Sequence, residues 1–124
     1  MSQKAYLLEQ RTTIFAENIL SLVKKIVPTL SNQPIISQLV RSATSIGANY
    51  HEANNAISKK DFRNKIYICQ KEANETKYWL RLLAKTNPEL INECRKFWQE
   101  AKEFTLIFSK ANSTMKKSLK LNGN

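Results

Sequence analysis

Residues 90–115, LINECRKFWQEAKEFTLIFSKANSTM, carry the most regular apolar repeat in the 124-residue chain. Apolar or small residues return there at alternating steps of four and three positions: Leu90, Cys94, Phe97, Ala101, Phe104, Phe108, Ala111 and Met115. A sustained repeat of this kind places one side of a helix along the seam of a bundle or coiled coil. The pattern predicts a helix over residues 88–112, with Asn87 as its cap and Pro88 at its first position.

Three further segments repeat apolar residues with the period of an amphipathic helix. They predict helices over residues 6–27, 34–57 and 59–85. Prolines between the first two segments would stop a continuous helix, because proline lacks the N–H that a helix interior needs. The chain contains only 2 Gly and 3 Pro, which is too few turn-forming residues for an all-β fold. The sequence therefore predicts an all-α fold.

Short connections join the predicted helices, and their length decides the expected architecture. Short connections favour antiparallel neighbours, so we expect residues 1–124 to form one domain, an antiparallel up-down-up-down four-helix bundle. No internal repeat or linker divides the chain. Residues 113–124 are polar and rich in lysine, and we expect them to form a basic tail that frays.

The formal net charge is +10, from 20 Lys and Arg against 10 Asp and Glu. Such a surface attracts anions, although charge alone does not choose among nucleic acid, an acidic protein and a membrane surface. A basic surface without a specific partner is the alternative. Charges interrupt residues 1–20 and no run of about 18 apolar residues occurs, so we expect a cytoplasmic protein without a membrane partner. Cys69 and Cys94 lie at apolar helical positions and are expected to be free thiols in the core.

Two helices have unusual surfaces. Residues 33–58 contain one base and one acid, whereas a solvent-facing helix is normally rich in Lys and Glu, so this helix is expected to be covered on both sides. The next helix has a second stripe beside its core positions: Ile68, Glu72, Glu75, Trp79 and Leu82. We interpret both features as an interface between copies of the chain in a cyclic homo-oligomer. The alternative is a third helix that sits deep in its own bundle.

A polar stripe lies between the core face and the outer face of the second helix: Arg41, Ser42, Ser45, Asn49 and Glu52. Arg41 and Glu52 are too far apart along one helix to pair, so we expect Arg41 to meet Glu72 or Glu75 of a neighbouring helix. Buried polar groups fix register and partner choice, and a structural role is therefore the preferred interpretation. A ligand site is the alternative.

Two basic clusters are the candidate nucleic-acid-binding residues. The first surrounds the start of the third helix: Lys59, Lys60, Arg63 and Lys65. The second lies near the end of the chain: Lys110, Lys116, Lys117 and Lys120. Neither cluster interleaves aromatic residues, so we expect phosphate contacts with little sequence preference and a steep dependence on salt. Solvated lysines without a ligand are the alternative.

Catalytic chemistry has little support in the sequence. His51 is the only histidine, so neither a pair of histidine metal ligands nor the two Glu-x-x-His motifs of a di-iron bundle can form. Ser42, Ser45 and Glu52 lack a base that would activate a serine nucleophile. We therefore expect no enzymatic activity, no metal and no cofactor.

Two motifs resemble a known family. Residues 41–52 have the pattern RSxxSIxxNxxE, and residues 72–80 read EANETKYWL, with Asp61-Phe62 between them. They resemble the 23S rRNA intervening-sequence family of four-helix-bundle proteins, a group that includes the accessory variability determinant of diversity-generating retroelements. The resemblance covers about Phe15 to Phe108. One departure is Ala53, where the family commonly has glycine after the glutamate.

The resemblance implies a homopentameric barrel with a basic surface. It also implies binding of RNA or DNA and, for the retroelement members, of a reverse transcriptase. Together with the charge, it leads to our main functional hypothesis, a basic oligomeric bundle that binds nucleic acid as accessory to a nucleic-acid enzyme. A protein–protein adaptor without a nucleic-acid role is the alternative.

Overall fold

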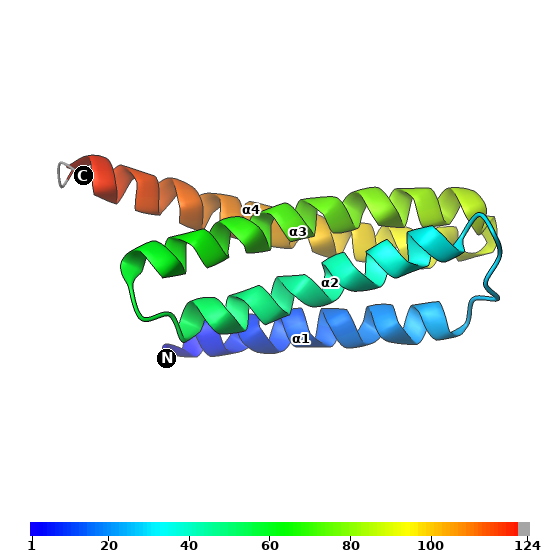
Figure 1. Cartoon of the computed structure of the whole chain (residues 1–124), viewed down its shortest axis with the longest axis horizontal. Helices are drawn as coiled ribbons and strands as arrows, with labels where there is room; N and C mark the ends of the chain where they lie inside the picture. Colours follow the sequence, from blue (N-terminus) through cyan, green and yellow to red (C-terminus); the bar gives the residue numbers. More distant parts are fainter. Residues whose placement is uncertain (122–124) are drawn as a thin grey trace.

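The computed structural model describes residues 1–121, which form four long helices. These are α1 (Gln3–Lys24), α2 (Gln33–Asn54), α3 (Lys59–Thr86) and α4 (Ile91–Leu121), with a 3₁₀ turn, η1 (Pro88–Leu90), before the last. The chain runs along the long axis of the molecule in each helix and turns back at each connection (Figure 1). The predicted all-α, four-helix fold is confirmed.

The ends of the first two helices differ from the predicted ends by a few residues. Helix α1 ends at Lys24 because Val27 precedes Pro28, and a residue before proline avoids the helical conformation. Helix α2 ends at Asn54, before the predicted end at residue 57, and the Asn55 side chain donates to the His51 carbonyl oxygen at 2.9 Å. That bond satisfies one of the free carbonyl groups of the last turn.

Caps explain where the helices begin. The side chains of Ser2 and Ser58 accept hydrogen bonds from the backbone N–H groups of Ala5 (3.1 Å) and Asp61 (3.0 Å). Asn87 makes no side-chain cap, contrary to the prediction. Its amide oxygen instead accepts a bond from buried Asn32 at 3.2 Å, which ties the α1–α2 connection to the α3–α4 connection at one end of the bundle.

Helix α4 is longer than predicted, because it continues to Leu121 through most of the segment expected to fray. No glycine or proline interrupts residues 91–121, and the lysines of this segment are good helix formers. Buried Asn112 also holds the helix against α3 through its contact with Gln70. The final residues of the predicted tail, 122–124, lie outside the described part of the chain. The far end of α4 projects beyond the other helices (Figure 1).

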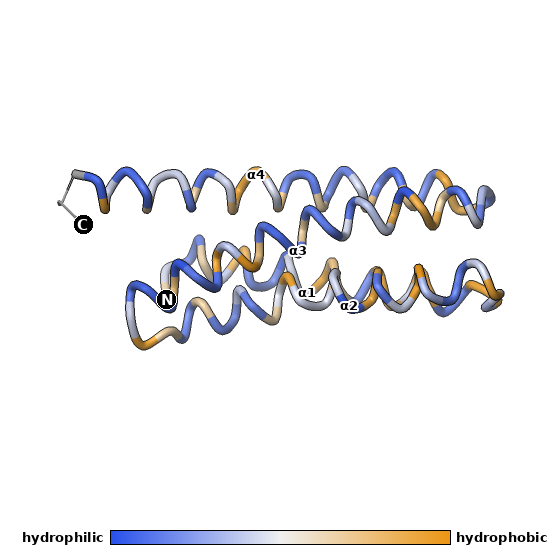
Figure 2. Tube along the Cα trace, turned by 45° about the horizontal axis from the view of Figure 1, so that its top comes forward, coloured by the Kyte–Doolittle hydropathy of each residue, from blue (hydrophilic) through white to orange (hydrophobic). Residues whose placement is uncertain are grey.

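The core lies along the helix seams predicted from the apolar repeats. Its largest fully buried apolar side chains come from all four helices: Ile19, Leu39, Ile46, Ile66, Leu80, Leu83, Phe104 and Phe108. Helix α3 packs along both α2 and α4, whereas α1 packs along α2 and approaches α4 at few points. Figure 2 shows hydrophilic residues recurring along the whole of α4. No helix within residues 1–121 has the length and hydropathy to cross a bilayer.

Candidate nucleic-acid interface

Arg41 forms an ion-pair cluster between α2 and α3. Its Nη1 lies 2.7 Å from Glu72 Oε2, its Nη2 pairs with Glu75, and its Nε donates to Gln38 Oε1 at 2.7 Å. Glu72 is buried, with 5% of its surface exposed, and a buried carboxylate needs a partner to offset its lost hydration. The predicted contact of Arg41 with Glu72 or Glu75 is therefore confirmed, and it lies within one chain.

The remaining polar residues of the α2 stripe are satisfied locally. Ser42 is fully buried and accepts a bond from Thr76 at 3.0 Å, while Ser45 donates to the Arg41 carbonyl oxygen at 2.6 Å. Asn49 donates to the carbonyl oxygen of Ser45 at 2.8 Å. Of these bonds, the one between Thr76 and Ser42 joins α3 to α2, whereas those of Ser45 and Asn49 lie within α2. This geometry favours the structural interpretation over a ligand site.

The second stripe of α3 is less exposed than the interface hypothesis assumed. Trp79 and Leu82 are half-buried against their own bundle, as is Ile68. The Trp79 ring meets Tyr78 edge-on, with a centroid separation of 5.0 Å. Ala48 on α2 is exposed and has only a methyl group to obstruct an approaching helix. The interface between copies therefore stays a prediction.

The positive surface arises because few bases are used in pairs. Three of them, Arg11, Arg41 and Lys65, together pair with five of the ten carboxylates. Every other Lys and Arg in residues 1–121 is without a carboxylate partner. Most of these unpaired bases lie on α3 and α4. Internal pairing therefore removes negative charge from the surface and concentrates positive charge on two helices.

The first predicted cluster is divided by one ion pair. Lys65 Nζ lies 2.6 Å from Glu52 Oε2, and this hydrogen bond raises the pKa of Lys65. Lys59 and Lys60 are exposed and Arg63 is half-buried, and none of the three pairs with a carboxylate. Lys59, Lys60 and Arg63 are therefore the members free to meet a phosphate, while Lys65 holds α3 to α2.

The two predicted clusters lie toward the same end of the molecule. The start of α3 and the end of α4 both lie at the end of the bundle where α1 begins (Figure 1), although the two helices diverge there (Figure 2). The contact of Gln70 with Asn112 fixes this alignment of the two helices. All four α4 lysines of the second cluster are exposed. Lys59, Lys60 and Arg63 at the start of α3 and Lys116, Lys117 and Lys120 at the end of α4 thus make up one cationic end, while Lys110 lies nearer the middle of the bundle.

A third group of cations surrounds Trp98, and the sequence analysis missed it. Lys77 Nζ and Lys102 Nζ lie 5.4 and 5.7 Å from the centroid of the Trp98 ring. Arg81 and Arg95 line a hollow beside the same ring. The signal was present in the spacing, since bases recur every four residues from Lys77 and flank Trp98 at positions three before and four after it.

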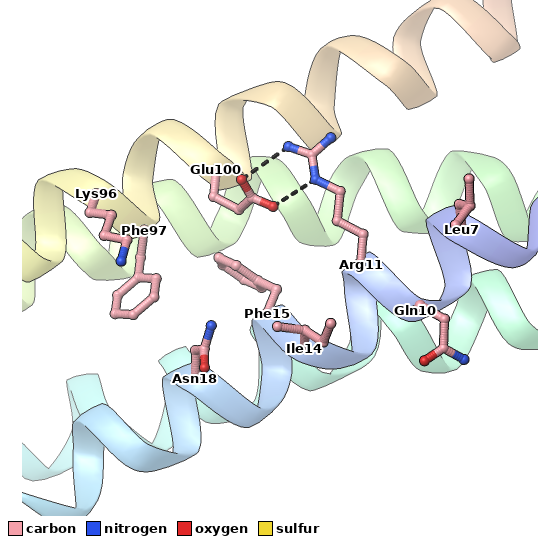
Figure 3. Close-up of a pocket in the computed structure, with 9 residues that line it drawn as sticks. All are labelled: Leu7, Gln10, Arg11, Ile14, Phe15, Asn18, Lys96, Phe97 and Glu100. Carbon is pink, nitrogen blue, oxygen red and sulfur yellow. Dashed lines mark hydrogen bonds and ion pairs between the residues drawn. The ribbon is translucent and has the colours of Figure 1, made fainter. Parts of the chain in front are cut away.

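A cavity of about 430 Å³ lies between α1 and α4, where these helices diverge (Figure 3). Phe15 and Phe97 form part of its wall. The guanidinium of Arg11 donates two hydrogen bonds to the carboxylate of Glu100, from Nε at 2.8 Å and from Nη2 at 3.0 Å. This carboxylate raises the pKa of Arg11 and neutralises its charge. Lys96 is then the one cation of the lining that has no carboxylate partner within residues 1–121. The lining contains no serine, cysteine or histidine.

Burial keeps both cysteines protonated. Desolvation raises the pKa of Cys69 to about 12 and that of Cys94 to about 11. Both thiols are free and buried, so the prediction of core thiols is confirmed. Within residues 1–121, no three His, Cys, Asp or Glu side chains are grouped to hold a metal ion. The absence of catalysis stays a prediction.

Comparison with known proteins identifies both a family and solved structures of the same fold. Residues 6–110 match the family described as 23S rRNA-intervening sequence protein. A crystal structure from Bacteroides thetaiotaomicron, described as a protein with unknown function from the S23 ribosomal protein family, has the same fold with a TM-score of 0.80. It is 34% identical, and the alignment covers 90% of this chain and 99% of that one. No curated protein matches the chain.

Proposed function

The chain belongs to the 23S rRNA-intervening sequence protein family, and from this premise we propose that it is a non-enzymatic basic bundle that binds nucleic acid through phosphate contacts. The observation that carries the proposal is the distribution of unpaired cations. The start of α3 carries Lys59, Lys60 and Arg63, and the end of α4 carries Lys116, Lys117 and Lys120. These two helix ends lie at the same end of the molecule, and none of the six bases pairs with a carboxylate of residues 1–121. When such a surface neutralises phosphates of a nucleic acid, it releases the counterions condensed on the nucleic acid, and this release favours the complex.

The choice of phosphate over an acidic protein rests on the start of α3. Cations in the first turn oppose the helix dipole, at about 0.3–1 kcal/mol each when exposed. The N–H groups of the same turn attract an anion, so a bound phosphate would satisfy the lysines and the helix end together. The contacts would involve the backbone of the nucleic acid and carry little sequence information.

A salt titration tests the proposal. Binding to a duplex should weaken steeply between about 50 and 200 mM salt. Reversing Lys59, Lys60 and Arg63 to Glu should reduce the slope of log K against log salt by about 2–3, since each lost phosphate contact changes it by about 0.9. Reversal of Lys4, Lys24 and Lys25, which changes net charge equally, should alter the slope less. Undetectable binding by the wild type at 50 mM salt would refute the proposal.

The proposed working form is a cyclic homo-oligomer, and the family resemblance indicates a pentamer. A ring repeats the cationic end in each subunit, so weak contacts with one strand gain avidity. Wild-type mass in solution should be a multiple of 14.3 kDa, and Ala48→Lys should return the monomer without loss of helicity. Gln99→Lys, exposed on α4, is the matched control. A monomeric wild type would refute the assembly.

A nucleic-acid enzyme is the proposed protein partner, and the resemblance points to a reverse transcriptase. Capture of the purified enzyme by the wild-type protein, with and without RNA, measures this interaction. The cytoplasmic location expected from the sequence stays a prediction.

A protein adaptor is the second candidate function, and the surface of α1 favours it. This helix exposes four large apolar side chains: Tyr6, Leu7, Ile14 and Leu20. Exposed apolar residues on a soluble surface are typical of protein interfaces. The adaptor predicts salt-tolerant capture of a protein together with negligible affinity for polynucleotides. The salt titration above therefore separates the two functions.

A further inference from the structure

The surface between α3 and α4 contains a hollow of about 190 Å³ with Trp98 at its edge. Its lining is apolar apart from two guanidinium groups: Leu80, Arg81, Ala84, Ile91, Cys94, Arg95 and Trp98. Trp98 is half-buried, and Leu80 and Cys94 are buried beneath the surface. The hollow thus offers a flat aromatic ring and an apolar floor that water reaches.

The two charged side chains that line the hollow are both cations, while the carboxylates of Glu89 and Glu93 act on the neighbouring Cys94. Arg81 and Arg95 are exposed, and neither bonds to a carboxylate within residues 1–121. Lys77 and Lys102 hold their ammonium groups 5.4 and 5.7 Å from the indole centroid. Four cations around one ring repel each other, so an anion bound beside the ring would lower their mutual repulsion.

An aromatic ring bordered by unpaired cations has the features that bind an unpaired nucleotide. A base stacks on an aromatic side chain, and the adjacent phosphates meet the cations. A base within a duplex is already stacked on both faces and cannot reach the ring. A simple lysine–tryptophan contact would cover the indole with side-chain stems, but it gives no role to Arg81 and Arg95.

We propose that the α3–α4 hollow binds one unpaired base of a single-stranded nucleic acid, stacked on Trp98 with its phosphates held by Lys77, Arg81, Arg95 and Lys102. The inference rests on the proposed function and adds a preference for single strands to it. The cationic end would then hold phosphates of any strand, whereas the Trp98 hollow would select strands with free bases.

Affinity measurements with a short oligouridylate test the hollow. Trp98→Leu should weaken binding roughly 5- to 100-fold, which is the effect expected from the loss of one stacked base. Trp98→Phe keeps an aromatic face and should retain most of the affinity. The same oligouridylate annealed to oligoadenylate, and inorganic polyphosphate, should bind the wild type and Trp98→Leu equally. Circular dichroism checks that each variant keeps its helicity.

Fluorescence gives a second readout, since Trp79 and Trp98 are the only two tryptophans. In Trp79→Phe, emission from Trp98 should be quenched by oligouridylate, because a stacked base quenches an indole. In Trp98→Phe, emission from Trp79 should not change. Oligodeoxythymidylate replaces the RNA in a parallel arm, and a difference in affinity between the two strands identifies which backbone the hollow accepts.

The outcomes separate the two proposals. If the wild type binds single strands and duplexes but Trp98→Leu affects neither, or weakens both equally, the hollow does not take a base while phosphate binding stands. Quenching by polyphosphate equal to that by oligouridylate would also overturn the hollow. If the wild type binds no polynucleotide, both proposals fail.

Discussion

The α1–α2 pair and the α3–α4 pair differ sharply in charge, although both are amphipathic helical hairpins of one bundle. Helices α1 and α2 contain four bases and three acids, whereas α3 and α4 contain fifteen bases and six acids. Both pairs expose large apolar side chains, among them Leu7 and Ile14 on α1 and Leu106 on α4, so the pairs differ in charge and not in exposed apolar residues. Both pairs thus bury an apolar face in the same core, but their exposed surfaces carry different charge.

This difference indicates a division of tasks between the two pairs. A surface with little charge loses little hydration when another protein covers it, whereas unpaired lysines and arginines are best satisfied by a polyanion. The two pairs are joined along the α2–α3 seam, and α1 meets α4 at few points. Substitutions at these two junctions therefore test how independent the pairs are.

The largest effect is expected at Phe104, the strongest link between α1 and α4. Its ring is fully buried, packs edge-on against Phe15 at 5.4 Å and lies 4.9 Å beneath the Arg11 guanidinium. Phe104→Ala should lower the free energy of unfolding by about 3–5 kcal/mol, measured in urea. Leu106→Ala, at an exposed site on the same helix, should change it by less than about 0.5 kcal/mol. If both variants lost the same free energy of unfolding, the packing of Phe104 would stabilise the fold no more than an exposed side chain does.

The next effect is expected at the seam between the two pairs. Arg41→Ala leaves the buried carboxylate of Glu72 without its partner and should cost about 2–3 kcal/mol, below the usual range for a buried pair because Arg41 is itself partly exposed. In a Glu72→Gln background the same substitution should cost much less. A double-mutant cycle by thermal unfolding measures the coupling, and zero coupling would show that the pair does not join α2 to α3.

The sequence was sufficient to predict the fold because the information lies in local periodicity. The 4–3 repeat from Leu90 to Met115 predicted the last helix, and the apolar periodicity of three other segments predicted the rest. Together with the small number of glycines and prolines, these patterns gave four helices and most of the core. Helix ends were less accurate: the polar, lysine-rich composition of residues 113–121 led to a predicted fraying tail, although no glycine or proline interrupts them. The contact of Asn112 with Gln70, which holds α4 against α3, is a tertiary contact that no local pattern reports.

The candidate site was only partly predictable, because pairing across helices decides which charges remain free. Lys65 appeared equivalent to Lys59 and Lys60 in sequence, but Glu52 on α2 occupies it. The Trp98 hollow combines residues of α3 and α4, and only the alignment of these helices brings Lys77 to Trp98. The Arg41 cluster was predicted because its partners lie in a recognisable motif.

A smaller effect is expected where Arg11 closes one end of the α1–α4 cavity. The two bonds between Arg11 and Glu100 join partly exposed side chains, so Glu100→Gln should cost at most about 1 kcal/mol. The visible consequence should be faster hydrogen exchange in α1, since few other contacts hold this helix to α4. Glu103→Gln is the matched control, because Glu103 makes a single longer contact of 3.2 Å with Arg11. Unchanged exchange would show that packing alone positions α1.

The smallest effect concerns the pH dependence of the α1–α2 contact. Asn54 donates to Glu9 at 2.8 Å and His51 lies 3.2 Å away, and these bonds lower the pKa of Glu9 from 4.5. A carboxyl group with a lowered pKa adds stability above pH 4.5, and that stability is lost as the pH falls through the lowered value. Wild-type stability should therefore decline below about pH 4.5 more steeply than that of Glu9→Gln, in thermal unfolding followed from pH 7 to 3. Glu17→Gln, exposed on the same helix without a partner among residues 1–121, should follow the wild type. Parallel curves for all three proteins would mean that the pKa of Glu9 is the same in the folded and the unfolded chain. The bonds of Glu9 to Asn54 and His51 would then add no stability.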